Sequence, residues 1–197
     1  MPYEFFHKRF PELAEKEIRR MILCPGTNVG TDDDLPAGDY HLVEMFCNDP
    51  GCDCRRVMFY VITPDTPPSE PLAVIAYGWE SEEFYAKWLG FDDPKVLAEL
   101  KGPVLNLGSP QSRYAGELLD LVNAIPLRDA NYVERLKRHY RMFRDAVDGE
   151  TAGRGKVGRG KTDWGSVDRQ SATFQRERNQ RKREFAATKH RRKKKRA

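Results

Sequence analysis

The sequence lacks any long run of hydrophobic residues. No window approaches the roughly 18 apolar residues that a membrane-spanning helix requires. Residues 1–21 also lack a continuous apolar stretch behind a basic start, which is the pattern of a secretory signal. We therefore expect a cytoplasmic protein with no membrane partner, in which cysteine thiols stay reduced.

Histidine is scarce, and glycine-rich nucleotide motifs are missing. The four histidines are His7, His41, His139 and His190. They share no motif, so no Ser/His/Asp or Cys/His catalytic arrangement can be argued. The Gly- and Ser-containing stretch at 101–112 lacks the spacing of a P-loop or a dinucleotide-binding loop, and a helix start explains it. The sequence therefore favours a protein that is not an enzyme.

Acidic residues are scarce in the last quarter of the chain. Residues 1–148 contain 17 Lys and Arg against 25 Asp and Glu, a net charge of −8. Residues 149–197 contain 17 basic but only 5 acidic residues, a net charge of +12. This segment also has few side chains that could form a core, so we predict a disordered basic tail behind one domain at 1–148. Residues 171–190 are expected to become helical when a partner neutralises their charge.

The first 148 residues contain both strand and helix patterns. Strand-like runs occupy 40–46, 55–62 and 72–79, and the first two flank a cysteine-rich loop as an antiparallel hairpin. Helical patterns occupy 11–22, 81–90, 93–102, 109–125 and 129–148. Together they predict an α+β fold, in which a small antiparallel sheet of about three strands is covered by four to five helices.

Three of the four cysteines lie in one short segment, FCNDPGCDCRRV at 46–57. Cys47, Cys52 and Cys54 have the spacing C-x4-C-x-C, and an Asp-Pro-Gly turn folds the first two towards each other. Cys24 begins a Cys-Pro-Gly turn, which is chemically like half of a zinc knuckle. Because zinc prefers four soft ligands at tetrahedral corners, we predict a structural Zn²⁺ site made by these four cysteines, with His41 as a substitute for one of them.

Other interpretations of the cysteines stay open, because the spacing is not that of a standard zinc finger, ribbon or knuckle. The thiols could be unligated and buried, or they could form a redox or disulfide site. A catalytic zinc would keep one position open beside a general base, whereas four cysteines favour a closed site. Arg55 and Arg56 are expected to offset part of the negative charge of the thiolates.

The basic tail is the segment most informative about a partner. Its Lys and Arg residues, mixed with Gly and single aromatic residues, suit phosphate contacts with occasional base stacking. We predict binding to nucleic acid, with RNA favoured over DNA and ribosomal RNA as one such partner. The predicted contact residues are Arg176, Arg178, Arg181, Lys182, Arg183, Lys189, Arg191, Arg192, Lys193, Lys194, Lys195 and Arg196. The tail lacks the apolar face or lipidation motif that membrane attachment requires.

Two further surfaces have alternative readings. The pattern at 129–148 places Arg135, Lys137, Arg138, Arg141 and Arg144 opposite an apolar stripe. A solvated face is the default interpretation, and a basic ramp that extends a nucleic-acid contact is the alternative. Aromatic residues crowd 77–91; most should belong to the core, but an exposed subset would make the protein an adaptor for another protein. A metal- or thiol-dependent enzyme is the remaining alternative.

Overall fold

The computed structural model describes residues 3–25, 35–67 and 69–154. Its elements are, in order, β1 (Tyr3–Phe5), η1 (Phe6–Lys8), α1 (Pro11–Glu17), β2 (Arg19–Leu23), β3 (Gly38–Cys47), β4 (Arg56–Ile62), β5 (Ala73–Gly78), α2 (Glu82–Leu89), α3 (Pro94–Lys101), β6 (Val104–Leu105), α4 (Ala115–Ala124), η2 (Pro126–Arg128) and α5 (Ala130–Arg154). The elements η1 and η2 are single turns of 3-10 helix. The predicted combination of strands and helices is confirmed.

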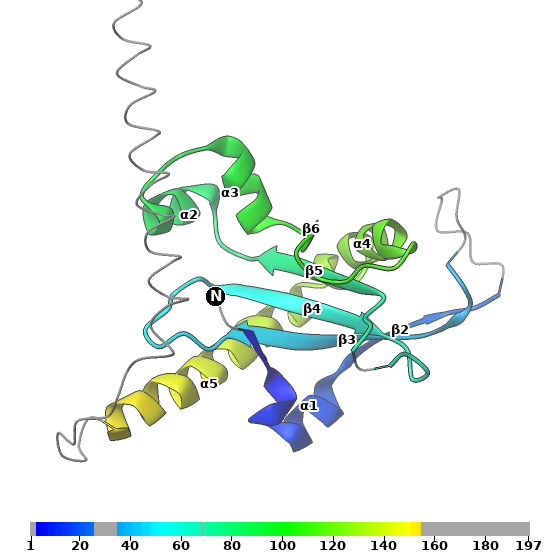
Figure 1. The fold of residues 1–197 in the computed structure, drawn as a ribbon, viewed down its shortest axis with the longest axis horizontal. Helices are drawn as coiled ribbons and strands as arrows, with labels where there is room; N and C mark the ends of the chain where they lie inside the picture. The colour runs from blue at the N-terminus through cyan, green and yellow to red at the C-terminus, as the bar shows by residue number, and fades with distance from the viewer. Residues whose placement is uncertain (1–2, 26–34, 68, 155–197) are drawn as a thin grey trace, which may run out of the picture. The chain divides into compact units, whose positions relative to one another are not determined.

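The sheet is larger than the predicted sheet of about three strands. It has six antiparallel strands in the order β1-β3-β4-β5-β6, with β2 also paired to β3 (Figure 1). The three predicted strands are its centre, β3, β4 and β5. The three additional strands, β1, β2 and β6, are short and lie at the edges of the sheet. Their strand conformation depends on pairing with a neighbouring strand more than on their own sequence pattern.

The predicted helix at 11–22 is wrong beyond residue 17. α1 ends at Glu17, and the residues after it form β2, which pairs with β3 from Arg19↔Leu42 to Leu23↔Gly38. Met21 and Leu23 are buried whereas Arg20 and Ile22 are exposed, which is the alternation of a strand with one buried face. The same apolar residues also fit a helical stripe, and the pairing with β3 decides between the two.

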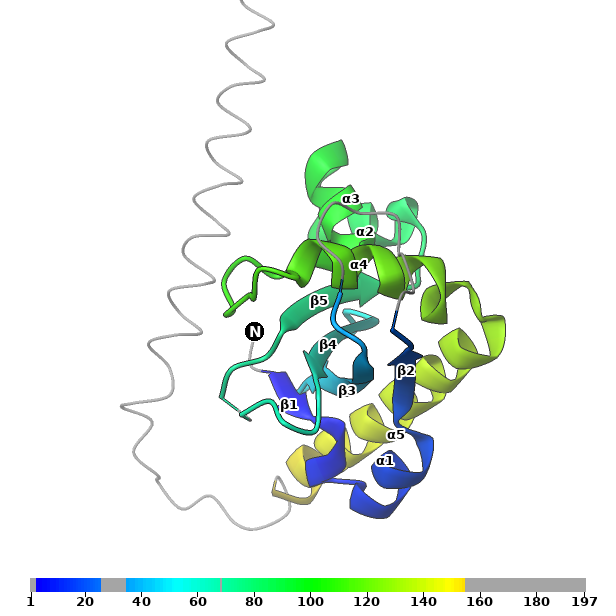
Figure 2. The same ribbon diagram turned by 90° about the vertical axis from the view of Figure 1, so that its right-hand side faces the viewer.

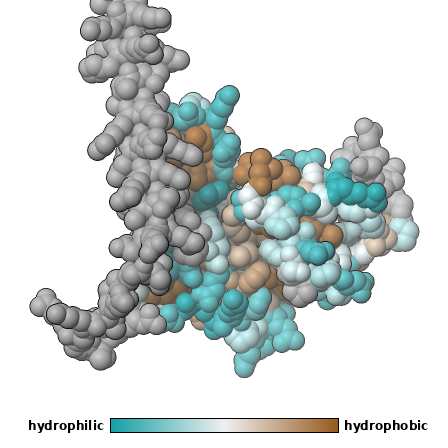
Figure 3. Space-filling view, in the orientation of Figure 1, coloured by the Kyte–Doolittle hydropathy of each residue, from teal (hydrophilic) through white to brown (hydrophobic). Residues whose placement is uncertain are grey.

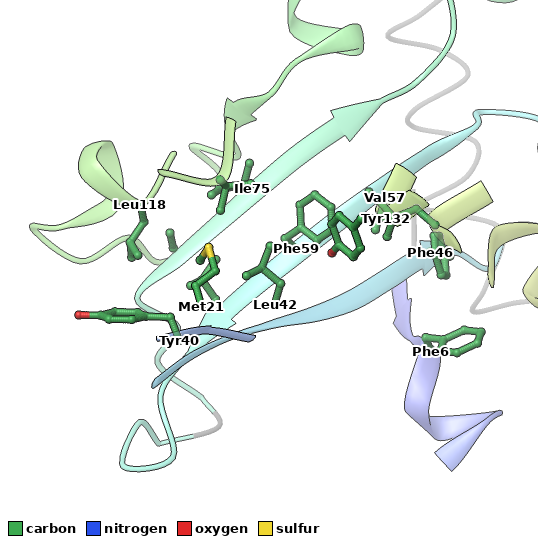
Figure 4. Packing of buried hydrophobic residues seen from close by; sticks show 14 of the residues in the cluster. Phe6, Met21, Tyr40, Leu42, Phe46, Val57, Phe59, Ile75, Leu118 and Tyr132 are labelled. Carbon is green, nitrogen blue, oxygen red and sulfur yellow. The ribbon is translucent and has the colours of Figure 1, made fainter. Parts of the chain in front are cut away.

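The core lies between one face of the sheet and the helices α4 and α5. Val57, Phe59 and Val61 of β4 are fully buried, and the residues between them are half-buried. Phe59 stacks on Tyr132 of α5 with ring centroids 6.2 Å apart (Figure 4). Leu118 of α4 belongs to the same cluster. α5 therefore crosses the buried face of the strands that lead into and out of the cysteine loop.

The predicted starts of α2 and α3 are confirmed, whereas the predicted start of the helix at 109–125 is wrong, because α4 (Ala115–Ala124) begins six residues later, after Tyr114, which makes no side-chain cap. Ser81 accepts a hydrogen bond from the backbone N–H of Phe84 at the start of α2, and Gly90 ends that helix with a φ of 76°. Asp93 caps α3 in the same way. α5 instead runs past the predicted end at residue 148 to Arg154. Residues 155–197, including every predicted nucleic-acid contact, lie outside the described residues.

The described surface is mostly hydrophilic, and the hydrophobic residues visible in Figure 3 form separate patches. The large hydrophobic side chains that are exposed in this part of the chain are Ile22, Leu107 and Ile125. Among the described residues, no helix is long and apolar enough to cross a membrane.

Candidate metal centre

The structure brings Cys47, Cys52 and Cys54 together. Cys47 is the last residue of β3, and the other two lie in the loop that leads to β4. Their three sulfur atoms all lie within 4.8 Å of one another, and none of the three forms a disulfide. Cys47 and Cys54 are fully buried, whereas Cys52 is half-buried. Three sulfur atoms that converge in this way could hold a metal ion.

The loop has a tight local geometry that turns the sulfurs inward. The N–H of Cys52 donates to the carbonyl of Asp49 at 3.1 Å, and Gly51 in this turn has a φ of 69°. Arg55 also has a positive φ, 47°, which is unusual for a residue with a side chain. Tyr85 donates to the carbonyl of Arg55 at 3.1 Å, and Arg55 N–H donates to Tyr140 Oη at 3.3 Å. Surrounding tertiary contacts therefore hold the backbone at the end of the loop.

Hydrogen bonds among the sulfurs divide the three thiols into two classes. The pKa of Cys47 is held well below its ordinary value because Cys52, Cys54 and the backbone N–H of Asp49 donate hydrogen bonds to its sulfur. The pKa of Cys52 and that of Cys54 are both raised, first because each keeps its proton in the hydrogen bond to Cys47. The N–H of Cys54 also donates to the Cys52 sulfur. Both donations run from residue i+2 to the sulfur of residue i, and they favour thiolates.

Three residues on one face of α5 form hydrogen bonds with the cysteine loop. Arg144 Nη1 donates to the carbonyls of Cys47 and Asp49, each at 3.0 Å, and Nη2 donates to Asp148 Oδ1 at 2.5 Å. Asp148 Oδ1 accepts in turn from the N–H of Gly51 at 2.9 Å. One turn earlier, Tyr140 Oη donates to the carbonyl of Cys52 at 3.4 Å. The side chain of Arg144 is only 9% exposed, so it brings a buried positive charge to the loop that carries the thiolates.

Replacing Arg144 with Met should destabilise the protein and weaken metal binding. The change leaves two loop carbonyls without their donor and removes a buried charge, so we expect the free energy of unfolding to fall by about 3 kcal/mol. Metal affinity should fall by roughly 10- to 100-fold, as for other groups that position ligands. Chemical denaturation and competition with a chromogenic chelator measure the two effects.

Arg141→Met is the matched control for that experiment. Arg141 lies on the same helix but is exposed, so both quantities should stay within experimental error of the wild type. Equal losses in the two variants would contradict the role given to Arg144.

The structure corrects the prediction that Cys24 is a ligand. Cys24 follows β2, whose Leu23 pairs with Gly38, and Cys47 is at the other end of β3. Those two ends of β3 are nine positions apart in an extended strand, a distance of roughly 30 Å. Cys24 is also exposed. The antiparallel pairing of β2 with β3, which the predicted helix at 11–22 ignored, carries this cysteine away from the loop.

His41, the predicted substitute ligand, is also remote from the sulfurs. It lies six residues before Cys47 on β3, which corresponds to about 20 Å along an extended strand. Its Nε2 lies 3.2 Å from Oδ2 of Asp39. Among the described residues, the group of cysteine, histidine and carboxylate side chains that can hold a metal is therefore the three-cysteine set alone.

Arg55 and Arg56, which were expected to offset the negative charge of the thiolates, direct their side chains to oxygen atoms elsewhere. The side chain of Arg55 pairs with Asp53 and Glu80, at 2.8 Å and 3.2 Å. Arg56 donates to the carbonyl of Glu99 at 3.1 Å. Sequence reasoning missed Arg144, because its contacts to the loop span 95 and 97 residues of sequence. Only the helical register with Tyr140 and Asp148, at i−4 and i+4, could have indicated it.

The predicted basic ramp on α5 is largely taken up by contacts within the domain. Arg135 and Arg138 both reach Glu17 of α1, and Lys137 pairs with Glu134 at 2.7 Å. Arg144 is buried at the cysteine loop. Arg141 is exposed, and its charge helps to lower the pKa of Glu134 after the larger effect of Lys137. These residues therefore do not form a continuous basic surface.

Aromatic residues of the 77–91 region also support the loop. Tyr85 is fully buried and reaches the loop backbone. Trp79 packs edge-on against Tyr140, with ring centroids 5.3 Å apart, and the guanidinium of Arg55 lies 4.5 Å from the ring centroid of Phe84. These contacts use the aromatic residues inside the domain.

No protein-family model, curated protein or solved structure matches this chain. Thiolate sulfur is a soft donor, which favours Zn²⁺, Cu⁺ or an iron–sulfur centre over Mg²⁺ or Ca²⁺. The described part of the chain contains a buried, three-sulfur site that could bind a metal ion of this thiophilic class.

Proposed function

We propose that this protein binds Zn²⁺ through Cys47, Cys52 and Cys54 and contacts RNA through its basic C-terminal tail. The convergence of the three sulfur atoms within 4.8 Å is the observation that carries the metal half of this proposal. Zinc is favoured among thiophilic ions because it has no redox chemistry and accepts three thiolates with a fourth ligand in tetrahedral geometry. The two backbone N–H donors to sulfur support the same assignment.

The ion would join parts of the chain that are distant in sequence. Its ligands end β3 and precede β4, and Arg144 and Asp148 of α5 hold the loop between those strands. Binding to this site would therefore stabilise the sheet and α5 together, which is a structural role for zinc. Three protein thiolates leave the fourth corner of a tetrahedral ion to a ligand other than Cys24.

RNA binding rests on the composition of the tail. Its net charge of +12 stands against −8 for the rest of the chain. Contacts to phosphates would release counterions, so affinity would fall steeply as salt rises. An acidic domain would be repelled by the same polyanion, which would confine the contact to the tail.

A catalytic metal site is the second candidate function. Three protein ligands with one free position are the coordination of catalytic zinc, and one of the three cysteines here, Cys52, is only half-buried. The nearest acid in sequence, Asp53, is paired with Arg55, so the structural role remains favoured. Cobalt substitution separates the two: added thiocyanate should change the visible spectrum if the fourth ligand exchanges freely, and leave it unchanged in a closed site.

Zinc uptake should release about two protons per ion at neutral pH. Hydrogen bonds from Cys52 and Cys54 lower the pKa of Cys47 and raise the pKa of the two donors, so we expect the three sulfurs of the metal-free protein to share two protons. All three must be thiolates to bind zinc, so two protons leave. Calorimetric titration in buffers of different ionisation enthalpy counts them. A release close to zero would show that thiols are not the ligands.

A further inference from the structure

The short helix α1 is attached to the domain with little hydrophobic burial. None of its seven residues is buried, and a cavity of about 250 Å³ is lined both by α1 and by Leu42, Val43 and Glu44 of β3. Leu13 and Ala14 are only partly buried against the core. Figure 2 shows α1 beside α5, away from α2 and α3. Since packing of an apolar face supplies most of the stability of a helix in a protein, the position of α1 must depend on other contacts.

Polar contacts with α5 hold the C-terminal end of α1. Glu17 is the last residue of α1, and its Oε2 lies 3.1 Å from Nε2 of His139 and pairs with Arg138. Nε of Arg135 lies 3.9 Å from the same oxygen. The dipole of a helix disfavours a carboxylate at this end. The three partners on α5 therefore supply the attraction that keeps Glu17, and α1 with it, in place.

Both ring nitrogens of His139 face carboxylate oxygens. Nδ1 lies 2.7 Å from Oε2 of Glu44, which is 7% exposed, and Nε2 faces Glu17. The ring itself is 1% exposed, and the ring of Phe6 stacks on it with centroids 4.4 Å apart. A neutral imidazole has one N–H and can donate to one carboxylate, whereas the imidazolium donates to both. The geometry therefore fits a His139 ring that carries two protons.

The two carboxylates would respond differently if His139 lost one proton. Among the described residues, the buried Glu44 carboxylate has His139 as its hydrogen-bond partner. Glu17 is 25% exposed and also pairs with Arg138. Leaving a buried charge unpaired costs more than leaving an exposed one, so the remaining N–H would stay on Nδ1 with Glu44. The lone pair on Nε2 would then face the Glu17 oxygen, and two facing acceptors repel each other.

We propose that His139 acts as a proton-dependent latch that holds α1 in place. In its charged form the ring joins Glu17 of α1 to Glu44 of β3, and α1 lies closed over the cavity. When the ring passes its Nε2 proton to water, the bond to Glu17 is lost and α1 moves away from α5. The apolar side chains of Phe6 and Leu42, which line the cavity, then become open to solvent. The latch is therefore closed at lower pH and opens as the pH rises.

Other charged and titratable groups surround the ring. They are Glu44 of β3, Glu15 and Glu17 of α1, His7 of η1, and Tyr132, Arg135 and Arg138 of α5. Burial raises the pKa of Tyr132, and the two arginines keep their charge, so none of these three changes in the pH range of an imidazole. Glu15 and His7 are exposed, so solvent screens their charges. His7 is the other imidazole at the cavity, and a substitution separates its effect.

NMR of the ¹³C,¹⁵N-labelled full-length protein measures both the ring and the helix. Side-chain ¹H–¹⁵N spectra between about pH 6 and about pH 9 show how many protons the His139 ring carries. The methyl signal of Ala14, which lines the cavity, reports the position of α1. At the lower pH both ring nitrogens should be protonated. As the pH rises, Nε2 should lose its proton, and the Ala14 signal should shift with the same midpoint. The equilibrium between closed and open α1 should change by about 10- to 100-fold, the effect of losing one hydrogen bond between charged groups.

Two substitutions separate the latch from other effects of pH. The amide introduced by Glu17→Gln can accept from the charged ring or donate to the neutral ring, so the Ala14 signal should stay near its low-pH position at every pH. His7→Gln removes the other imidazole that lines the cavity and should leave the titration of the Ala14 signal unchanged. Four results would each overturn the proposal: an Ala14 signal that does not follow His139, a single protonated nitrogen in that ring at about pH 6, a ring that keeps both protons up to about pH 9, or a titration that His7→Gln abolishes.

Discussion

The Cys54→Ser protein is expected to purify without stoichiometric metal. Cys54 is fully buried, so no other donor can take its place beside Cys47 and Cys52 without rearranging the loop. A hydroxyl is a poor zinc ligand, and zinc affinity should fall by a factor of about 1,000 or more. At a free zinc concentration 1,000-fold above the wild-type Kd, zinc binding stabilises the folded wild-type protein by about 4 kcal/mol. Because the variant loses most of this stabilisation, its melting temperature should be about 10 °C lower.

Cys24→Ser makes the same chemical change at a position remote from the loop. It should retain one zinc per chain and the wild-type melting temperature, because Cys24 is exposed and at the far end of β3 from Cys47. Elemental analysis and thermal unfolding of the two variants, purified identically, check both statements. If Cys24→Ser lost metal to the same degree, a four-cysteine site would be right and the three-cysteine site wrong.

Replacing the twelve basic tail residues from Arg176 to Arg196 that are predicted to contact RNA with Gln should abolish most RNA binding at moderate salt. Each phosphate contact with single-stranded RNA adds about 0.7 to the slope of log affinity against log salt. If roughly eight phosphates are contacted, the slope falls by about 6, and affinity near 0.1 M salt falls by about 1,000-fold or more. Fluorescence anisotropy with a labelled RNA, at several salt concentrations, measures both.

The control neutralises basic residues on the domain. Lys87, Lys95, Lys101 and Arg141 are exposed, and their replacement with Gln should leave both affinity and salt slope close to the wild type. A wild-type salt slope in the tail variant would rule out the tail as the phosphate contact. A duplex DNA of equal length, run in parallel, shows whether RNA is preferred.

Local sequence signals predicted the elements that local chemistry determines. Ser81 and Asp93 cap α2 and α3 because their side chains accept from N–H groups within the same turn. β3, β4 and β5 were predicted from their apolar runs. β2 was missed because its few apolar residues fit either period, and only its pairing with β3 selects the strand.

The residues of the candidate site also differ in whether the local sequence could predict them. Cys47, Cys52 and Cys54 could be predicted as a set because a single turn of the chain connects them. The predicted fourth ligand, Cys24, depended on a long-range arrangement that the strand topology does not allow. Arg144 stayed hidden for the same reason, since its loop partners are far from it in sequence. Site residues that are close together in the sequence could therefore be predicted, whereas the contacts that complete the site depend on the tertiary fold.

X-ray absorption at the zinc edge, on protein purified without chelator or added metal, examines the coordination itself. The three-cysteine site predicts about one zinc per chain, with three sulfur neighbours at about 2.3 Å and one lighter nitrogen or oxygen neighbour at about 2.0 Å. Four sulfur neighbours would require a further thiolate and contradict the geometry at Cys24. Protein that carries no zinc, with three freely titratable thiols at these positions, would contradict the metal centre altogether.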